Sequence, residues 1–74
     1  MIKDNPLFIF KEQNPHVTWE SLRNDTGVAK WTLEIIAKKK PIQVLTMTIR
    51  TCLRIKKATG VDMLQWYFDK VEKI

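Results

Sequence analysis

Apolar side chains recur every three or four residues in five segments of this chain. That spacing predicts amphipathic helices, each with one face turned toward a core. The chain contains only two glycines and three prolines, which favours helices over a turn-rich sandwich. The predicted helices span residues 6–13, 19–25, 29–39, 47–59 and 63–74.

Residues that start and stop helices bound the first two segments. Pro6 suits the first position of a helix. The Asn14–Pro15 pair ends that helix, because the residue before a proline is pushed out of the helical region. Thr18 is a suitable N-cap for the second helix. Gly27 ends it, since glycine tolerates the left-handed conformation of a tight helix exit.

The second half of the chain carries similar signals. Pro41 breaks the third helix, and we expect residues 41–45 to form an extended connection with apolar anchors. Thr46 is the expected cap of the fourth helix, and Gly60 its end. Asp62 is the expected cap of the fifth helix. The sequence therefore predicts one all-α domain over residues 1–74.

The apolar faces of the five helices predict a shared core. The fourth helix should bury a stripe made of Ile49, Cys52 and Leu53, with Met47 and Ile55 beside it. The other expected core residues are Leu7, Phe8, Phe10, Val28, Leu33, Ile36, Met63, Leu64, Tyr67 and Phe68. Three consecutive aromatic residues cannot all face inward from one helix, so Trp66 or Phe68 is predicted to lie in a dimer contact.

The charge of the chain is concentrated in its middle. The formal net charge is +5. Residues 29–57 hold eight basic residues against one acid, Glu34, whereas the rest of the chain holds five basic residues against seven acids. This asymmetry predicts an anionic partner that faces the middle of the chain. The alternative is that these basic residues belong to ordinary solvated helix faces.

Composition favours a small intracellular domain without a membrane segment. The single cysteine, Cys52, has no partner for an internal disulfide, which indicates a reducing compartment, and we expect a cytoplasmic protein. The apolar run near the N-terminus is interrupted by Asp4 and Pro6 and is too short to span a membrane. We therefore expect no association with a membrane.

Nothing in the sequence has the spacing of an active site. His16 is the only histidine, and a metal site needs three or four ligands. Cys52 lies on the apolar face of its predicted helix, where packing is its expected role. The acids form no pair with catalytic spacing, and no glycine-rich phosphate loop is present. We expect neither an enzyme nor a cofactor.

The segment "WESLRNDTGVAKWTLEIIAKKK", residues 19–40, has the parts of a helix-turn-helix. In that motif one helix crosses the DNA backbone and the next enters the major groove. It needs an apolar residue on the first helix, a glycine at the turn and apolar residues on the inner face of the second helix. The sequence supplies these in order as Leu22, Gly27, Val28, Leu33 and Ile36.

From Thr18 to Phe68 the chain resembles the Cro/lambda-repressor-type helix-turn-helix family, also called Xre-like. A later stretch, "TGVDML" at residues 59–64, is similar to a segment common near the end of that domain. The resemblance implies a compact five-helix domain that binds double-stranded DNA, usually as a dimer on a near-palindromic site. It also implies a transcription regulator of a phage or bacterial genetic switch.

The chain departs from the family pattern at four places. Arg23 stands where a small alanine is common, so its stem must point outward or the two helices must open. Trp19 stands where a glutamine often touches a phosphate, and Ala29 where a serine often caps the recognition helix. The segment 41–60 is several residues longer than usual.

The resemblance places the partner surface on the third helix. Its expected contact residues are Lys30, Trp31, Thr32, Glu34, Ile35, Lys38, Lys39 and Lys40. Early residues of the helix would meet base edges, and the three lysines after it would meet phosphates. Further phosphate contacts are expected at Thr18, Trp19 and Arg50. Arg50, Arg54 and Lys57 share one helical face, which is a second phosphate stripe, a partner surface or a solvated face.

Trp31 and Ile35 leave a second function open. They lie four residues apart and therefore on the same side of the third helix. An exposed apolar stripe is more typical of a protein contact than of a DNA groove. The alternatives are that Ile35 packs against the fourth-helix segment, or that Trp31 covers sugar edges and thymine methyls. The second hypothesis is therefore a modulator or antirepressor of the same fold, which binds a repressor protein through the third helix.

Overall fold

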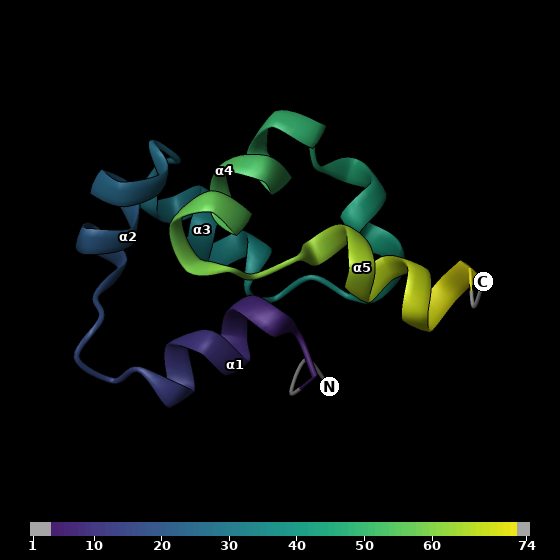
Figure 1. Cartoon of the computed structure of the whole chain (residues 1–74), viewed down its shortest axis with the longest axis horizontal. Helices are drawn as coiled ribbons and strands as arrows, with labels where there is room; N and C mark the ends of the chain where they lie inside the picture. The colour runs from purple at the N-terminus through teal and green to yellow at the C-terminus, as the bar shows by residue number, and fades with distance from the viewer. Residues whose placement is uncertain (1–3, 73–74) are drawn as a thin grey trace.

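The chain folds as a helical domain whose elements lie close to the predicted places (Figure 1). The computed structural model describes residues 4–72. Within that range there is no strand. The α-helices are α1 (Pro6–Gln13), α2 (Trp19–Thr26), α3 (Lys30–Ile36), α4 (Ile49–Thr59) and α5 (Met63–Tyr67). A 3₁₀-helix, η1 (Pro41–Thr46), precedes α4, and a π-helical turn, η2 (Phe68–Glu72), follows α5. The predicted all-α class is confirmed.

The helices pack around one centre. The radius of gyration is 11.4 Å, close to the ~11 Å expected for a compact chain of this length. In Figure 1, α1 runs along one side of the molecule, α2 lies at one end, and α3 lies behind α4. The α2 helix packs against both α3 and α4, and α5 packs against η1 and α1. The helix pair α2–α3 is thereby held between α4 and the rest of the domain.

Local capping explains most of the helix ends. The Thr18 hydroxyl accepts from the backbone N–H of Ser21 at 3.1 Å, and the Asp62 carboxylate accepts from that of Gln65 at 2.9 Å. Gly27 and Gly60 end α2 and α4 with φ of 74° and 80°, a conformation that favours glycine. These four predicted ends are confirmed.

The connection before α4 differs from the prediction. Residues 41–46 form the 3₁₀-helix η1 rather than an extended segment, because the Gln43 side chain accepts from the backbone N–H of Lys40 at 2.7 Å and closes the first turn. Thr46 does not cap α4, since its hydroxyl donates to the carbonyl of Gln43 at 2.6 Å. Thr48 is the cap instead, accepting from the backbone N–H of Thr51 at 3.2 Å.

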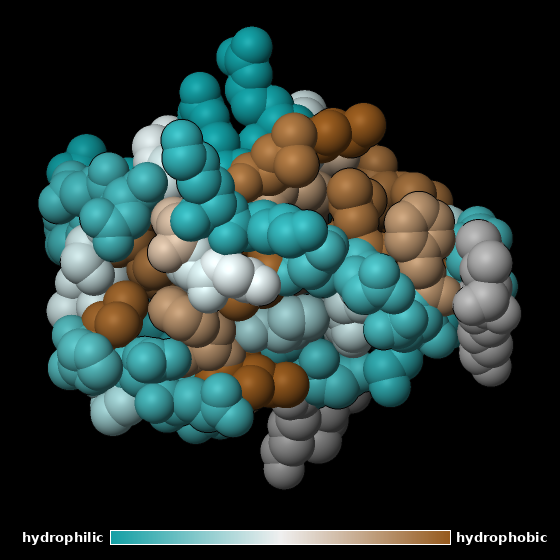
Figure 2. Space-filling model, in the orientation of Figure 1, coloured by the Kyte–Doolittle hydropathy of each residue, from teal (hydrophilic) through white to brown (hydrophobic). Residues whose placement is uncertain are grey.

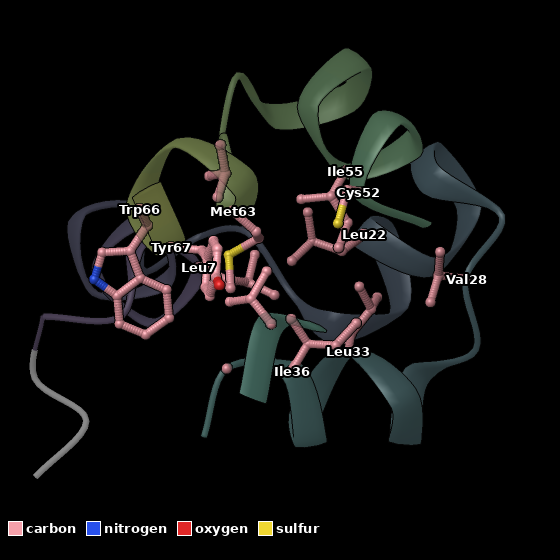
Figure 3. Packing of buried hydrophobic residues seen from close by; sticks show 13 residues of the cluster. Leu7, Leu22, Val28, Leu33, Ile36, Cys52, Ile55, Met63, Trp66 and Tyr67 are labelled. Atoms are coloured by element: carbon pink, nitrogen blue, oxygen red, sulfur yellow. The ribbon is translucent and has the colours of Figure 1, made fainter. Parts of the chain in front are cut away.

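The core contains residues from every α-helix (Figure 3). Its members in residues 4–72 are Leu7, Leu22, Val28, Leu33, Ile36, Ala37, Val44, Cys52, Ile55, Val61, Met63, Trp66 and Tyr67. Phe8, Phe10, Met47 and Leu64 pack against this cluster while partly buried. In Figure 3, Leu7, Met63 and Tyr67 lie together near the centre, and Cys52, Ile55 and Leu22 form the side toward α2 and α4.

Two predicted core residues on α4 lie on the surface. Ile49 is 66% exposed and Leu53 is 57% exposed. The buried stripe is Cys52 and Ile55, and Leu53 follows Cys52 by one residue, a rotation of about 100° out of that stripe. Ile49 begins the helix, and the start of α4 projects away from α5 in Figure 1. Periodicity therefore predicted the helix correctly but wrongly assigned Ile49 and Leu53 to its buried face.

The C-terminal aromatic residues also differ from the prediction. Trp66 is buried in the domain's own core, which contradicts a dimer contact for this residue. Phe68, an expected core residue, is exposed, so the other half of that prediction, a dimer contact at Phe68, stays a prediction. The helix loosens to π geometry after Tyr67, whose hydroxyl donates to Glu72 at 2.9 Å across five residues. The predicted end of this helix at residues 73 and 74 lies outside the described residues.

Candidate nucleic-acid interface

The turn between α2 and α3 is held from both sides. The Thr26 hydroxyl donates to the carbonyl of Leu22 at 2.7 Å and accepts from the backbone N–H of Val28 at 3.0 Å. Gly27 lies between these bonds in the left-handed conformation. The core cluster contains Leu22 of α2, Val28 of the turn and Leu33 of α3, and all three are buried as the sequence predicted. The direction in which α3 leaves the turn is therefore fixed by side-chain bonds and by packing.

The departures from the family pattern are accommodated without opening this turn. Arg23 is exposed and lies 3.7 Å from Glu20, one turn earlier on α2, so its stem does point outward. Ala29 precedes α3 without a side-chain cap. The α3 helix is shorter than predicted and ends at Ile36, because Ala37 and Lys38 form a turn before Pro41.

The far end of α3 is tied to the start of α1 by Asn5. This side chain is fully buried. Its Nδ2 donates to the carbonyls of Ile36 at 2.9 Å and Lys39 at 3.0 Å, while its Oδ1 accepts from the backbone N–H groups of Leu7 at 3.0 Å and Phe8 at 3.2 Å. Asn5 thus caps one helix and holds the exit of another.

The outer face of α3 carries the predicted contact residues. Trp31 is 67% exposed and Ile35 is 49% exposed, and both lie at its centre. Lys30 is exposed at the start of the helix, whereas Thr32 and Glu34 are partly buried on its two flanks. The structure therefore presents an apolar centre with polar flanks.

The two flanks border different hollows. Thr32 lines a hollow of about 250 Å³ together with Trp31 and Ile35, closed on the other side by Met47, Thr48 and Thr51 at the start of α4. Glu34 lines another hollow with Phe8 and Trp19. Glu34 is therefore turned toward α1 and α2 and away from the face of Thr32. Met47, Thr48 and Thr51 were not predicted as site residues, since no sequence pattern indicates which turn of α4 approaches α3.

The lysines after α3 lie around its exit. Lys38 and Lys40 are exposed. Lys39 is partly buried, lines the Trp31 hollow and donates through Nζ to the Thr46 hydroxyl at 2.8 Å. The three side chains therefore do not form one uniform lysine cluster, because Lys39 is engaged with η1.

The three other predicted phosphate contacts occupy different settings. Thr18 is exposed, but its hydroxyl is engaged in the cap of α2. Trp19 is partly buried against the core, and Lys11 Nζ lies 5.2 Å from its ring centroid, within cation–π range. Arg50 is exposed on α4. Another α4 residue is closer to the turn: Arg54 Nη1 lies 3.7 Å from the position that a Cβ on Gly27 would take.

The ion pairs of the described residues leave most of the basic residues around α3 and α4 free. They join Glu20 to Arg23, Asp62 to Lys56 and Asp4 to Lys70. The pKa of Asp62 is lowered, first because Gln65 N–H donates to its carboxylate and then because of Lys56. Within residues 4–72, the basic residues of the α3–α4 region without an ion pair are Lys30, Lys38, Lys39, Lys40, Arg50, Arg54 and Lys57. Unpaired cations favour an anionic partner.

A second exposed apolar surface lies on η1 and the first half of α4. We call it the η1–α4 face and define it by Ile42, Leu45, Ile49 and Leu53, all more than half exposed. Figure 2 shows hydrophobic side chains gathered over η1 and the start of α4, continuing toward η2. Phe68 and Val71 of η2 are also exposed there. Such a concentration of large apolar side chains is typical of an interaction surface.

The side chains that could hold a metal ion or act as a nucleophile lie apart in the described residues. No group of three or more His, Cys, Asp and Glu side chains comes together within residues 4–72. His16 is exposed in the connection between α1 and α2. Cys52 is buried, as predicted, and burial raises the pKa of its thiol. In the same range, no helix has both the length and the apolar character needed to cross a membrane.

The comparisons with known proteins identify no relative. The chain matches no family model, no curated protein and no solved structure. The resemblance to the Cro/lambda-repressor-type family therefore stays a prediction from the residues, and any function rests on the geometry of the α2–α3 pair and its surroundings.

Proposed function

We propose that this chain is a small helix-turn-helix DNA-binding domain of the Cro/lambda-repressor type, which acts as a transcription regulator in a phage or bacterial genetic switch. The observation that carries the proposal is the α2–α3 pair itself. The pair is joined at left-handed Gly27 and packed through Leu22 and Leu33, and the outer face of α3 is left uncovered. A helix held in this way can enter the major groove while its partner helix crosses the backbone.

The surrounding charges support duplex DNA as the partner. Lys38 and Lys40 at the exit of α3, and Arg54 beside the turn, are exposed cations without an ion pair among the described residues. In this arrangement they contact phosphates and fix the register of α3 on the duplex. Lys30 and Thr32 are the polar groups of α3 best placed to approach base edges.

Salt-dependent titration of random-sequence duplex DNA tests the proposal. Binding should weaken steeply with salt, with a log–log slope of about −0.9 for each phosphate contacted. Lys38→Ala and Lys40→Ala should each reduce the size of that slope by about one. Lys70→Ala on η2 is the matched control, since it removes an exposed lysine far along the chain from α3. Absence of binding at low salt would rule out direct DNA recognition.

A second candidate function uses the same surface for a protein. We infer it from the exposed indole of Trp31 beside the hollow that Ile35 and Met47 line. In this case the chain is a modulator or antirepressor, and the partner is a repressor protein. Trp31→Ala should then weaken the complex by about 2 kcal/mol or more, as for a typical interface anchor. Capture of host proteins, run beside selection of DNA from a random pool, separates the two functions.

We also infer that the η1–α4 face is covered by a second copy of this chain. A two-fold contact places the same surface of both copies together. The α4 helix carries only basic charges, including Arg50, whereas η2 next to the face carries the acids Asp69 and Glu72 against one base, Lys70, so that a second copy offers opposite charges as well as apolar contact. Such a dimer would present two α3 helices to one near-palindromic site.

Sedimentation equilibrium tests this self-association. The wild-type chain should form a dimer that Ile49→Glu disrupts, because the substitution places a charge in the centre of the η1–α4 face. Ile9→Glu on α1, at an apolar residue 36% exposed, is the matched control. A wild-type chain that remains monomeric at high micromolar concentration would exclude the dimer.

A further inference from the structure

The centre of the outer face of α3 has no group that could make a bidentate hydrogen bond to a base. Among the residues of α3, Lys30–Ile36, only Lys30 is of a type that forms paired bonds to a base, and it lies at the start of the helix and not at the centre of the face. Glu34 is turned toward Phe8 and Trp19 rather than to the centre of the face. The central side chains are therefore Trp31 and Ile35, which can make only apolar contacts, besides the single indole N–H.

Base edges in the major groove offer one apolar group. It is the C5-methyl of thymine, since the other groups on those edges are hydrogen-bond donors and acceptors. An apolar helix centre gains nothing from guanine or adenine acceptors, and it desolvates them. It gains free energy only where methyl groups come against it.

The dimensions of the face fit methyl groups on neighbouring bases. Residues four apart on a helix are separated by about 6 Å along its axis, and successive bases of one strand by about 3.4 Å. Trp31 and Ile35 therefore reach methyls on thymines one or two steps apart. A hollow of about 250 Å³ lies beside them and deepens this part of the surface, where a methyl group can enter. Its wall includes the methyl-bearing side chains of Thr32, Met47 and Thr51.

The charges around this apolar centre favour a nucleic acid as its occupant. Lys30 is exposed at the start of the same helix, Lys39 lines the hollow, and Arg54 lies beside the Gly27 turn. Cations around an apolar centre match the phosphates that flank the base edges of a groove.

We propose that Trp31 and Ile35 recognise thymine C5-methyl groups in the major groove, so that the domain selects sites with thymines one or two steps apart. This inference rests on the proposed DNA-binding function, because it names what the outer face of α3 recognises. It makes Trp31 and Ile35 the residues that select thymine, while Lys38 and Lys40 at the exit of α3 supply phosphate contacts that do not depend on sequence.

Replacing thymine by uracil tests the inference directly, because uracil lacks only the methyl group. The probes are an alternating A·T duplex and the same duplex with uracil in place of thymine, titrated in parallel at equal salt. Each methyl covered should strengthen binding roughly fourfold, and two methyls roughly fifteenfold. An alternating G·C duplex should gain affinity when its cytosines carry a C5-methyl group, which occupies the same position in the groove.

Four variants locate the effect. Trp31→Ala and Ile35→Ala should each reduce the preference for the thymine duplex from roughly fifteenfold to roughly fourfold, and circular dichroism should show them folded because both side chains are exposed. Ile9→Ala, at an exposed isoleucine on α1, should keep the full difference. Lys38→Ala should weaken binding to both duplexes by the same factor and leave their ratio unchanged.

The outcomes separate this inference from the function on which it rests. Equal affinity of the wild-type chain for the two duplexes, with a normal salt slope, overturns methyl recognition and leaves the DNA-binding function in place. A preference for thymine that stays undiminished in both alanine variants also overturns it. If the chain binds neither duplex at low salt, the proposed DNA-binding function itself is wrong. The second candidate function, binding of a protein partner through Trp31, is then favoured.

Discussion

Asn5 is the single polar side chain on which the position of α3 most depends. It is fully buried, and its amide links the start of α1 to the exit of α3 through four hydrogen bonds. Two substitutions separate the two halves of this role. Asn5→Ser keeps an oxygen that can cap α1 but has no amide to donate, and Asn5→Ala removes both functions.

The hydrogen bonds of Asn5 give the loss of unfolding free energy expected for each half of its role, the cap of α1 and the bonds to the exit of α3. The two bonds to the carbonyls of Ile36 and Lys39 should contribute about 0.5–1.5 kcal/mol each. The cap should contribute about 1 kcal/mol. The Ile36 carbonyl also accepts from the backbone N–H of Lys39 at 3.1 Å, so that it keeps one partner in either variant. We therefore expect Asn5→Ser to lose about 1–3 kcal/mol and Asn5→Ala about 2–4 kcal/mol.

These losses are large for a domain of this size. At about 0.05–0.15 kcal/mol per residue, 74 residues give a total stability of roughly 4–11 kcal/mol. Asn5→Ala would remove about a fifth or more of that total, and at about 4–8 °C per kcal/mol it should lower Tm by roughly 10–30 °C. Substituting an exposed residue usually changes stability by less than about 0.5 kcal/mol.

Urea unfolding followed by far-UV circular dichroism measures both variants against the wild-type chain. Thr18→Ala is the matched control, because it removes an exposed cap that makes no long-range bond, and it should cost only about 1 kcal/mol. If Asn5→Ser is as stable as the wild-type chain, the bonds to α3 contribute nothing and the reasoning is refuted. If Asn5→Ala loses no more than Thr18→Ala, the same conclusion follows.

Three other outcomes follow from local features. Gly27→Ala should cost about 1–2 kcal/mol in urea unfolding because its φ is positive, and Gly60→Ala should cost about the same; a wild-type midpoint would contradict this. Cys52 is buried with a raised pKa, so a thiol reagent should react with the folded chain only at the rate of opening, and fast reaction without denaturant would show an accessible thiol. The lowered pKa of Asp62 means that its stabilising contribution is present at neutral pH and is lost as the pH falls through that lowered value. Asp62→Asn, which keeps a capping oxygen without the charge, should show a weaker loss in acid, and an unchanged acid profile would argue against a lowered pKa of Asp62, whose first cause is the bond from Gln65 N–H.

Local chemistry allowed much of the fold to be predicted from the sequence. The ends of α2 and α4 at Gly27 and Gly60 were predicted correctly because a left-handed exit depends on the residue itself. The caps at Thr18 and Asp62 were predicted because a side chain reaches a backbone N–H only a few residues ahead. The inward side of α3 was also correct, since spacing defines which side of a helix is apolar.

Periodicity failed where burial depends on where a neighbouring helix ends. Ile49 and Leu53 belong to an apolar helix, but the helices around α4 cover only part of it, so both side chains are exposed. Thr46 was the expected cap of α4, but its hydroxyl donates to the carbonyl of Gln43 in a 3₁₀ turn that the sequence did not predict, and Thr48 caps the helix instead.

For the candidate site, the sequence by itself determined that Trp31 and Ile35 share one side of α3, because residues four apart lie on the same side of a helix. Only the tertiary structure decided that Met47 and Thr51 of the α4 region close a hollow beside them, and that Glu34 turns to the opposite flank. It alone also placed Asn5 against the exit of α3, more than thirty residues away along the chain. Such contacts depend on the relative placement of whole helices, which no local spacing records.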